Sequence, residues 1–366
     1  MVAAAFVICF AAGYFVGPYI SSNAVSESFP DLLLLVATVL VSLYVAMMLQ
    51  VIIHEAGHLV FGLLSGYRFS SFRIFNFMWM RESDGKIHLK RFSLAGTGGQ
   101  CLMAPPDMKD GKMPVVLYNL GGSLLNFISS AALLPLLIAF NSVPYLGTLL
   151  RLFVLLGFAL GLINWLPIKT STVNTDGHNA IMLHGSREAM HAFWAQMKVN
   201  ELQSLGVRIS DMPEELFYVP SDEAMKNPIV ATVGVFSCNR LMDEKRFSEA
   251  DDLMAHLLSI DSGIVGIHRA LMHCDRAYIE LIGDCRADVV RSYLTKEVRT
   301  VMKAMSSFPS VIRTEYACAI LIEKNASRAE QLRLRFDKIS SSYPYPTDIE
   351  AERDLMDEVA KRAARS

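Results

Sequence analysis

Residues 32 to 65 form one apolar stretch of about 34 residues, which constrains the fold more than any other segment. As a straight α-helix it would be about 51 Å long, whereas the hydrocarbon core of a bilayer is about 30 Å thick. We therefore expect a membrane-spanning helix that tilts, protrudes or breaks. The only histidines and acidic residues of the stretch belong to the run His54-Glu55-Ala56-Gly57-His58. Because a charged side chain in lipid costs on the order of 2.5 kcal/mol or more, these residues mark a functional site.

The spacing of this run favours a metal site. On an α-helix His54 and His58 are four residues apart, so they lie on one face and can share a tetrahedral Zn²⁺ through their imidazole nitrogens. Glu55 lies about 100° further around the helix, beside the metal, where it can act as the general base of a metalloprotease. The alternative is a pair of core histidines bonded to neighbouring helices, in which Glu55 would also need a buried partner.

Composition and hydropathy predict a membrane protein with four spans. The chain has 366 residues, is 52% hydrophobic and has a mean hydropathy of +0.33. Besides the segment around the motif, apolar spans are expected at about residues 2–20, 113–140 and 145–168. A signal peptide cleaved near residues 22–24 is the rival interpretation of the first span. We favour a retained helix because no Lys or Arg precedes the apolar run, which is also too long.

Loop charges predict the orientation of the spans. Residues 66–112 carry eight basic side chains, whereas the loop around Glu27 and residues 141–144 carry none. The eight are Arg68, Arg73, Arg81, Lys86, Lys90, Arg91, Lys109 and Lys112. By the positive-inside rule the 66–112 loop is cytoplasmic. We therefore expect a multi-pass protein of the cytoplasmic membrane, with both termini and the C-terminal domain in the cytoplasm.

A catalytic zinc site needs a third protein ligand, and Asp176 is the best candidate. It follows the cytoplasmic end of the last expected span and would meet His54 and His58 if the chain folds back into the bundle. Two histidines and one carboxylate leave the fourth position of zinc open to water, which is the arrangement of a catalytic site. Structurally, Asp-Gly is also a common turn sequence.

Asn126 and Asn164 each place an amide in an apolar span. Either could donate a hydrogen bond to a developing oxyanion, an interaction worth roughly 3 to 4 kcal/mol in a well-built site. The alternative is that they join helices to one another, a common use of Asn in membranes that suits the small residues Gly121, Gly122 and Ser123.

Three motifs between about residues 31 and 180 resemble the site-2 protease family of intramembrane zinc metalloproteases. They are His54-Glu55-Ala56-Gly57-His58, Gly121-Gly122-Ser123-Leu124-Leu125-Asn126, and Asn164-Trp165-Leu166-Pro167 followed by Asp176-Gly177. The resemblance implies zinc ligands at His54, His58 and Asp176, catalysis by Glu55, and Asn126 near the oxyanion. His178, two residues beyond Asp176, is the reserve ligand.

The loop from 68 to 100 is expected to contain a β-hairpin. Residues 72–80 and 86–92 are rich in strand formers and flank Ser83-Asp84-Gly85, a sequence typical of a turn. An exposed strand edge could hold a substrate in an extended form by backbone pairing. The alternative is a cytoplasmic hairpin that packs on the bundle. The glycines of residues 95–99 are expected to form a flexible loop.

The sequence pattern of the second half of the chain predicts a soluble, helical region. We divide the chain into a membrane-embedded metalloprotease domain (1–180), a juxtamembrane helical linker (181–226) with a helix at 187–205, and a helical-hairpin domain (227–366) of degenerate tetratricopeptide-like pattern. Such a domain usually binds protein or peptide, so a protein partner is a hypothesis. A net charge of -2 gives no pull toward nucleic acid.

The sequence thus predicts an all-α membrane protein, a four-span bundle with a β-hairpin insertion and a C-terminal helical domain. The expected function is zinc-dependent endopeptidase activity on membrane-spanning or membrane-inserted segments. A membrane-tethered regulator, a leftover signal peptide or a pheromone precursor would each be a suitable substrate. The alternative is a non-catalytic membrane scaffold that keeps a structural zinc site, in which Glu55 would have no use as a general base.

Overall fold

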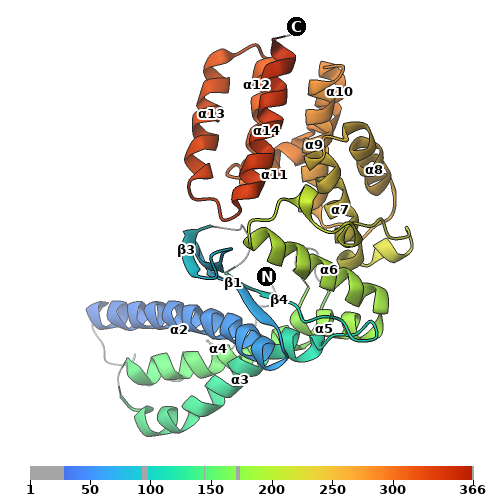
Figure 1. Ribbon diagram of the computed structural model, residues 1–366. Helices are drawn as coiled ribbons and strands as arrows, with labels where there is room; N and C mark the ends of the chain where they lie inside the picture. The colour runs from blue at the N-terminus through green and yellow to red at the C-terminus, as the bar shows by residue number, and fades with distance from the viewer. Residues whose placement is uncertain (1–28, 93–97, 144, 170–173, 365–366) are drawn as a thin grey trace. The chain divides into compact units, whose positions relative to one another are not determined.

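The computed structural model describes residues 29–92, 98–143, 145–169 and 174–364, which divide into two compact units (Figure 1). The first unit contains residues up to 68 together with 98–101 and 114–185. The second contains residues 69–97, 102–113 and 186 onward. The span expected at residues 2–20, and with it the signal-peptide alternative, lies outside the described residues.

In the described part of the first unit, three helices are long and apolar enough to cross a membrane, which indicates a membrane protein. They are α2 (Phe29–Leu64), α3 (Val115–Phe140) and α4 (Leu146–Trp165), with hydropathies of 2.7, 2.0 and 2.2. Only 12% of the most apolar window of α2 and 17% of that of α3 is buried in the protein, so these side chains are left for lipid to cover. Helix α2 continues without a break for 36 residues.

Glycines let α2 and α3 approach each other at the level of the histidines. A Cβ atom on Gly57 of α2 would overlap the carbonyl group of Gly121 on α3, and one on Gly122 would lie 2.6 Å from the ring of His54. Small residues at helix contacts allow this closeness in membranes, where packing rather than hydrophobicity holds helices together. The His54 ring therefore fits against α3 only because position 122 carries no side chain.

The expected hairpin is part of a four-stranded antiparallel sheet with the strand order β3-β2-β1-β4. Its strands are β1 (Arg68–Ile74), β2 (Phe77–Arg81), β3 (Ile87–Arg91) and β4 (Gly99–Ala104). The predicted turn at residues 83–85 does join β2 to β3, and Gly85 has a φ of +76° there. The run 72–80 is not one strand, because it reverses at Phe75, whose φ is 52°. The prediction of a single hairpin was therefore too simple.

The C-terminal part of the chain is helical, as predicted. A short helix of the first unit, α5 (Asp176–Gly185), precedes it. The helices of the second unit are α6 (Arg187–Ser204), α7 (Pro228–Asp243), α8 (Phe247–Ser259), α9 (Gly266–Ile282), α10 (Ala287–Tyr293), α11 (Lys296–Ala304), α12 (Pro309–Leu321), α13 (Ala326–Ser340) and α14 (Pro346–Ala363). Asn227 caps α7 by accepting a bond from the amide of Ile229, and Pro228 suits the first turn because its missing N–H needs no partner there.

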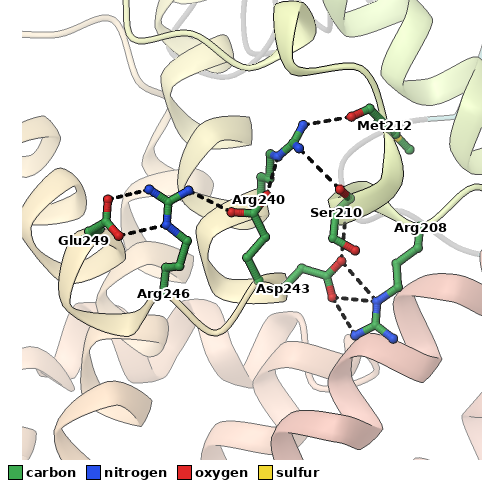
Figure 2. Close-up of polar contacts among 8 residues, drawn as sticks. Arg208, Ser210, Met212, Arg240, Asp243, Arg246 and Glu249 are labelled. Atoms are coloured by element: carbon green, nitrogen blue, oxygen red, sulfur yellow. Dashed lines mark hydrogen bonds and ion pairs between the residues drawn. The ribbon is translucent and has the colours of Figure 1, made fainter.

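Polar contacts fix the segment between α6 and α7 in place (Figure 2). The carboxylate of Asp243 accepts bonds from the guanidinium of Arg208 and from the amide of Ser210. Arg240, one turn earlier on α7, donates to the carbonyl oxygens of Met212 at 2.9 Å and of Ser210. This connection contains the short 3-10 helices η1 (Ile209–Asp211), η2 (Glu214–Leu216) and η3 (Ala224–Lys226). Because Asp243 and Arg240 both belong to α7, the connection is held against that helix.

A cavity of about 200 Å³ inside the second unit is lined by several carboxyl groups. Arg313 of α12 is 1% exposed and pairs with Asp275 of α9 and Glu352 of α14 at 2.5 and 2.9 Å. Asp348 accepts a hydrogen bond from Gln203 at 3.2 Å. Burial, with added repulsion from Glu352 and Asp243, raises the pKa of Asp348 to about 7. Ionisation of Asp348 therefore lowers the stability of the folded protein.

We expect Asp348→Asn to stabilise the protein above pH 7 and to leave its stability unchanged near pH 4. Between about pH 4 and 7 the folded state keeps a proton that the unfolded state has released, so wild-type stability falls as pH rises through this window. At about 1.4 kcal/mol for each pKa unit, the rise from 3.8 to about 7 sets an upper limit of about 4 kcal/mol on the gain at high pH. Thermal unfolding of the full chain in detergent measures it, with the exposed Asp357→Asn on the same helix as control. An equal gain at both pH values would contradict this origin.

Candidate metal centre

Three side chains from two helices of the first unit converge on one point. The Nε2 atoms of His54 and His58 are 3.3 Å apart, and Oδ2 of Asp176 lies 3.1 Å from the first and 3.7 Å from the second. One ligand atom from each residue lies within 4.8 Å of the others. The three side chains are 12 to 18% exposed, so the site is largely shielded from solvent. This group could hold a metal ion.

The hydrogen bonding of Asp176 supports that interpretation. Its Oδ2 atom is buried, and it has no hydrogen-bond donor among the described residues. A buried carboxylate oxygen without a partner is costly, whereas a cation among the three ligand atoms would satisfy it. The donor set fits a divalent metal of the kind that imidazole and carboxylate bind together.

Both imidazoles are oriented through their other nitrogen. The Nδ1 atom of His54 lies 2.8 Å from Oδ1 of Asn126, and that of His58 lies 2.9 Å from the carbonyl oxygen of Tyr118. These oxygens only accept, so each Nδ1 carries the hydrogen and each Nε2 lone pair faces the third ligand. Such bonds are typical partners of metal-bound histidines, because they fix the ring and its tautomer.

Asn126 is itself held by a buried glutamine of α2. Its amide nitrogen donates to the carbonyl oxygen of Gln50 at 3.0 Å and to Oε1 of the same residue at 2.6 Å. Gln50 in turn donates to the carbonyl oxygen of Phe153 on α4 at 2.9 Å. The structure therefore places Asn126 as a positioning residue for His54, with its amide hydrogens directed at Gln50. Both amide hydrogens of Asn126 take part in these two bonds, so in this arrangement neither is left for the predicted bond to an oxyanion.

Thr175 brings Asp176 to the histidines. Its hydroxyl donates to the carbonyl oxygen of Leu166 at 2.6 Å and accepts from the amide of Ile168 at 3.0 Å, which ties the start of α5 to the end of α4. Gly177 lies directly against the carbonyl group of Trp165, where a Cβ atom would overlap it. The close approach of the two helix ends therefore depends on these residues on either side of Asp176.

Glu55 lies beside the first residue of β4. A Cβ atom on Gly99 would stand 2.7 Å from Oε1 of Glu55, so the carboxylate reaches the backbone there only because position 99 is glycine. Glu55 is not one of the three potential ligands, which leaves it next to the group rather than in it. A carboxylate in that position can hold and move a proton.

The other predicted residues stand apart from this group. Asn164 donates to the carbonyl oxygen of Leu160 in its own helix at 3.1 Å. The reserve ligand His178 does not belong to the group of described residues that could hold a metal, whereas Asp176 does. Sequence reasoning missed Gln50, Thr175 and the Tyr118 carbonyl. Of these, only Gln50 carried a signal: it precedes His54 by four residues, as His54 precedes His58, so all three share one helix face.

Comparison of the chain with protein-family models, with curated proteins and with solved structures gave no match. The geometry of the chain's own residues is therefore the ground for any statement about its activity.

We expect Asn126→Ala to weaken metal binding about 10- to 100-fold, the usual effect of removing the hydrogen-bond partner of a ligating histidine. Without Oδ1 of Asn126 the ring of His54 loses its bond at Nδ1 and is free to turn. The measurement is competition for Zn²⁺ between the purified protein and a chromophoric chelator. Asn164→Ala is the matched control, because among the described residues that amide bonds within its own helix. Equal affinities for all three proteins would rule out the positioning role.

Proposed function

We propose that this chain is a zinc-dependent intramembrane endopeptidase that resembles the site-2 protease family. The observation that carries the proposal is the convergence of His54, His58 and Asp176 beside Glu55, with both histidines on a helix apolar enough to cross a membrane. Two imidazoles and one carboxylate supply three ligands, and a catalytic zinc site keeps its fourth position open. A structural zinc site usually has four protein ligands, which argues against the scaffold alternative.

Each of these residues would have a separate role in hydrolysis. A bound zinc ion supplies Lewis-acid polarisation of the scissile carbonyl and lowers the pKa of water. Glu55 accepts a proton from the attacking water and gives it to the leaving amine nitrogen. Asn126 and the Tyr118 carbonyl keep the two imidazoles in the orientation that holds the metal. The shielded site limits access of bulk water to the reacting groups.

The substrates would be membrane-spanning or membrane-inserted peptide segments. The histidines belong to a helix whose apolar side chains are mostly left for lipid, so a substrate that reaches them would come from the membrane. A tethered regulator, a signal-peptide remnant or a pheromone precursor fits this class. The proposed location is the cytoplasmic membrane, with the basic 66–112 segment and the C-terminal helices on the cytoplasmic side.

Metal removal tests the proposal. The full chain is purified in detergent, its zinc content is measured, and cleavage of a panel of single-span substrates is followed by mass spectrometry. Treatment with a strong chelator is expected to abolish cleavage, and added Zn²⁺ to restore it. Cleavage that continues in the metal-free protein, or a fully loaded protein that cleaves no member of the panel, would contradict the proposal.

A further inference from the structure

A second cavity on the C-terminal helices is lined by residues of α10, α11, α12 and α13 of the second unit. Its volume is about 450 Å³, within the range of about 300 to 1,000 Å³ that is usual for ligand pockets. Part of its wall is apolar and consists of Val290, Leu294, Met302, Cys318 and Ile322. A bound group could therefore bury an apolar portion there.

The polar part of the wall carries an excess of positive charge. Its basic residues are Arg291, Arg299, Lys303, Arg328 and Arg335, and its acidic residues are Glu315 and Glu323. The formal charge of the wall is five minus two, or +3, although the whole chain has a net charge of -2. Positive charge is thus concentrated at this cavity.

Three of these five cations have no anionic partner among the described residues. Arg328 pairs with Glu323 at 2.5 Å, and Arg335 stands 4.0 Å from Glu315. Arg299 donates its Nε hydrogen to the carbonyl oxygen of Leu294, which fixes the guanidinium without neutralising it. In the part of the chain that the structure describes, Arg291 and Lys303 form no ion pair. Three cations are therefore available to a ligand.

We propose that this cavity, named here the basic pocket, binds an acidic peptide segment of a partner protein with an apolar side chain among its carboxylates. Arginine suits such a ligand because its planar guanidinium bonds carboxylates in pairs. The three available cations come from two different helices, α10 and α11, which matches carboxylates spaced along a peptide better than one compact phosphate. The two carboxylates in the wall would repel a dianion more strongly than a monoanion.

Cys318 provides a reporter for the pocket. It is half-buried, and burial raises the pKa of its thiol to about 11, so alkylation near neutral pH is slow and sensitive to further covering. Cys285 is also half-buried but does not line the pocket. The ratio of alkylation at these two thiols, read by mass spectrometry, therefore reports occupancy of the pocket within one molecule.

The test uses the full chain in detergent and a fluorescent peptide of alternating glutamate and leucine, with glutamine in place of glutamate as the neutral peptide. Fluorescence anisotropy is expected to show binding of the acidic peptide, at least tenfold tighter than the neutral one and weaker at high salt. The double variant Arg291→Glu/Lys303→Glu is expected to lose at least tenfold in affinity. The double variant Lys296→Glu/Arg333→Glu, which changes the net charge equally on exposed parts of α11 and α13, is expected to lose less than twofold.

Three outcomes of these measurements would overturn the proposal outright. Equal binding of both peptides, equal losses in both double variants, or undiminished alkylation of Cys318 would each do so. Displacement of the peptide by inorganic phosphate at low concentration would make the ligand a phosphate group instead. Binding of anionic lipid vesicles that depends on Arg291 and Lys303, without binding of the peptide, would make it a membrane surface. None of these results depends on the metal centre, so the proposed protease function can fail or stand separately.

Discussion

Glu55→Gln is expected to lower peptide cleavage by about 10²- to 10⁴-fold while the protein keeps its metal, because that is the usual contribution of a general acid–base group. Glutamine has nearly the shape of glutamate and fits the same space beside Gly99, but it cannot accept a proton from water. Since Glu55 is not one of the three potential ligands, metal content should stay at the wild-type level.

The comparison needs zinc content and cleavage rate from the same preparations. Glu188→Gln makes the same chemical change on an exposed part of α6 and should leave both quantities unaltered. A Glu55→Gln protein that cleaves at more than a tenth of the wild-type rate would show that another group moves the proton. Loss of zinc along with activity would show instead that Glu55 helps to hold the metal.

The three long apolar helices were predictable from sequence because a long apolar run that enters lipid can only be helical. Each described helix end of α2, α3 and α4 lies within three residues of its predicted position. A long apolar run must satisfy its backbone groups internally, which leaves the helix as its only solution. Helix α2 already includes Phe29, the first described residue, which lies outside the apolar run.

The sheet was harder to predict because its decisive features are not visible in local patterns. The reversal at Phe75 uses a positive φ without a glycine, and Asn76 beside it is a single, weak turn signal. Strand β4 begins at Gly99, in a segment expected to be a flexible loop, and it pairs with β1 about thirty residues earlier in the chain. Pairing over that distance is decided by packing and not by local propensity.

The candidate metal centre could likewise be predicted only in part from the sequence. His54 and His58 were assigned from their spacing on one helix, which is a local property. Asp176 is more than a hundred residues further along the chain, and its approach depends on Thr175 and Gly177 at the junction of α4 and α5. The role of Asn126 depends on which way its amide faces, and only the contacts with Gln50 determine that.

Asp176→Ala is expected to weaken zinc binding by more than about 100-fold, since removing even a partner of a ligand costs up to that much. The closest control is His178→Ala, two residues away on the same helix and outside the potential ligand group. Competition with a chromophoric chelator measures both affinities. If His178→Ala loses zinc and Asp176→Ala keeps it, the third ligand is His178.

Thermal stability gives a second, independent measure of the same ligand. In wild type, Oδ2 of Asp176 is buried without a hydrogen-bond donor among the described residues, so the metal-free protein carries an unsatisfied charge. Zinc should therefore raise the unfolding temperature of wild type in proportion to the logarithm of its concentration. Asp176→Asn removes the charge while keeping the shape, so the metal-free variant should be at least as stable as metal-free wild type and should gain little from zinc. A variant that zinc stabilises as strongly as wild type would show that the Asp176 carboxylate does not bind the metal. If Asp176→Asn does not destabilise the metal-free protein but loses the stabilisation by zinc, the carboxylate serves metal binding at the expense of the apoprotein's stability.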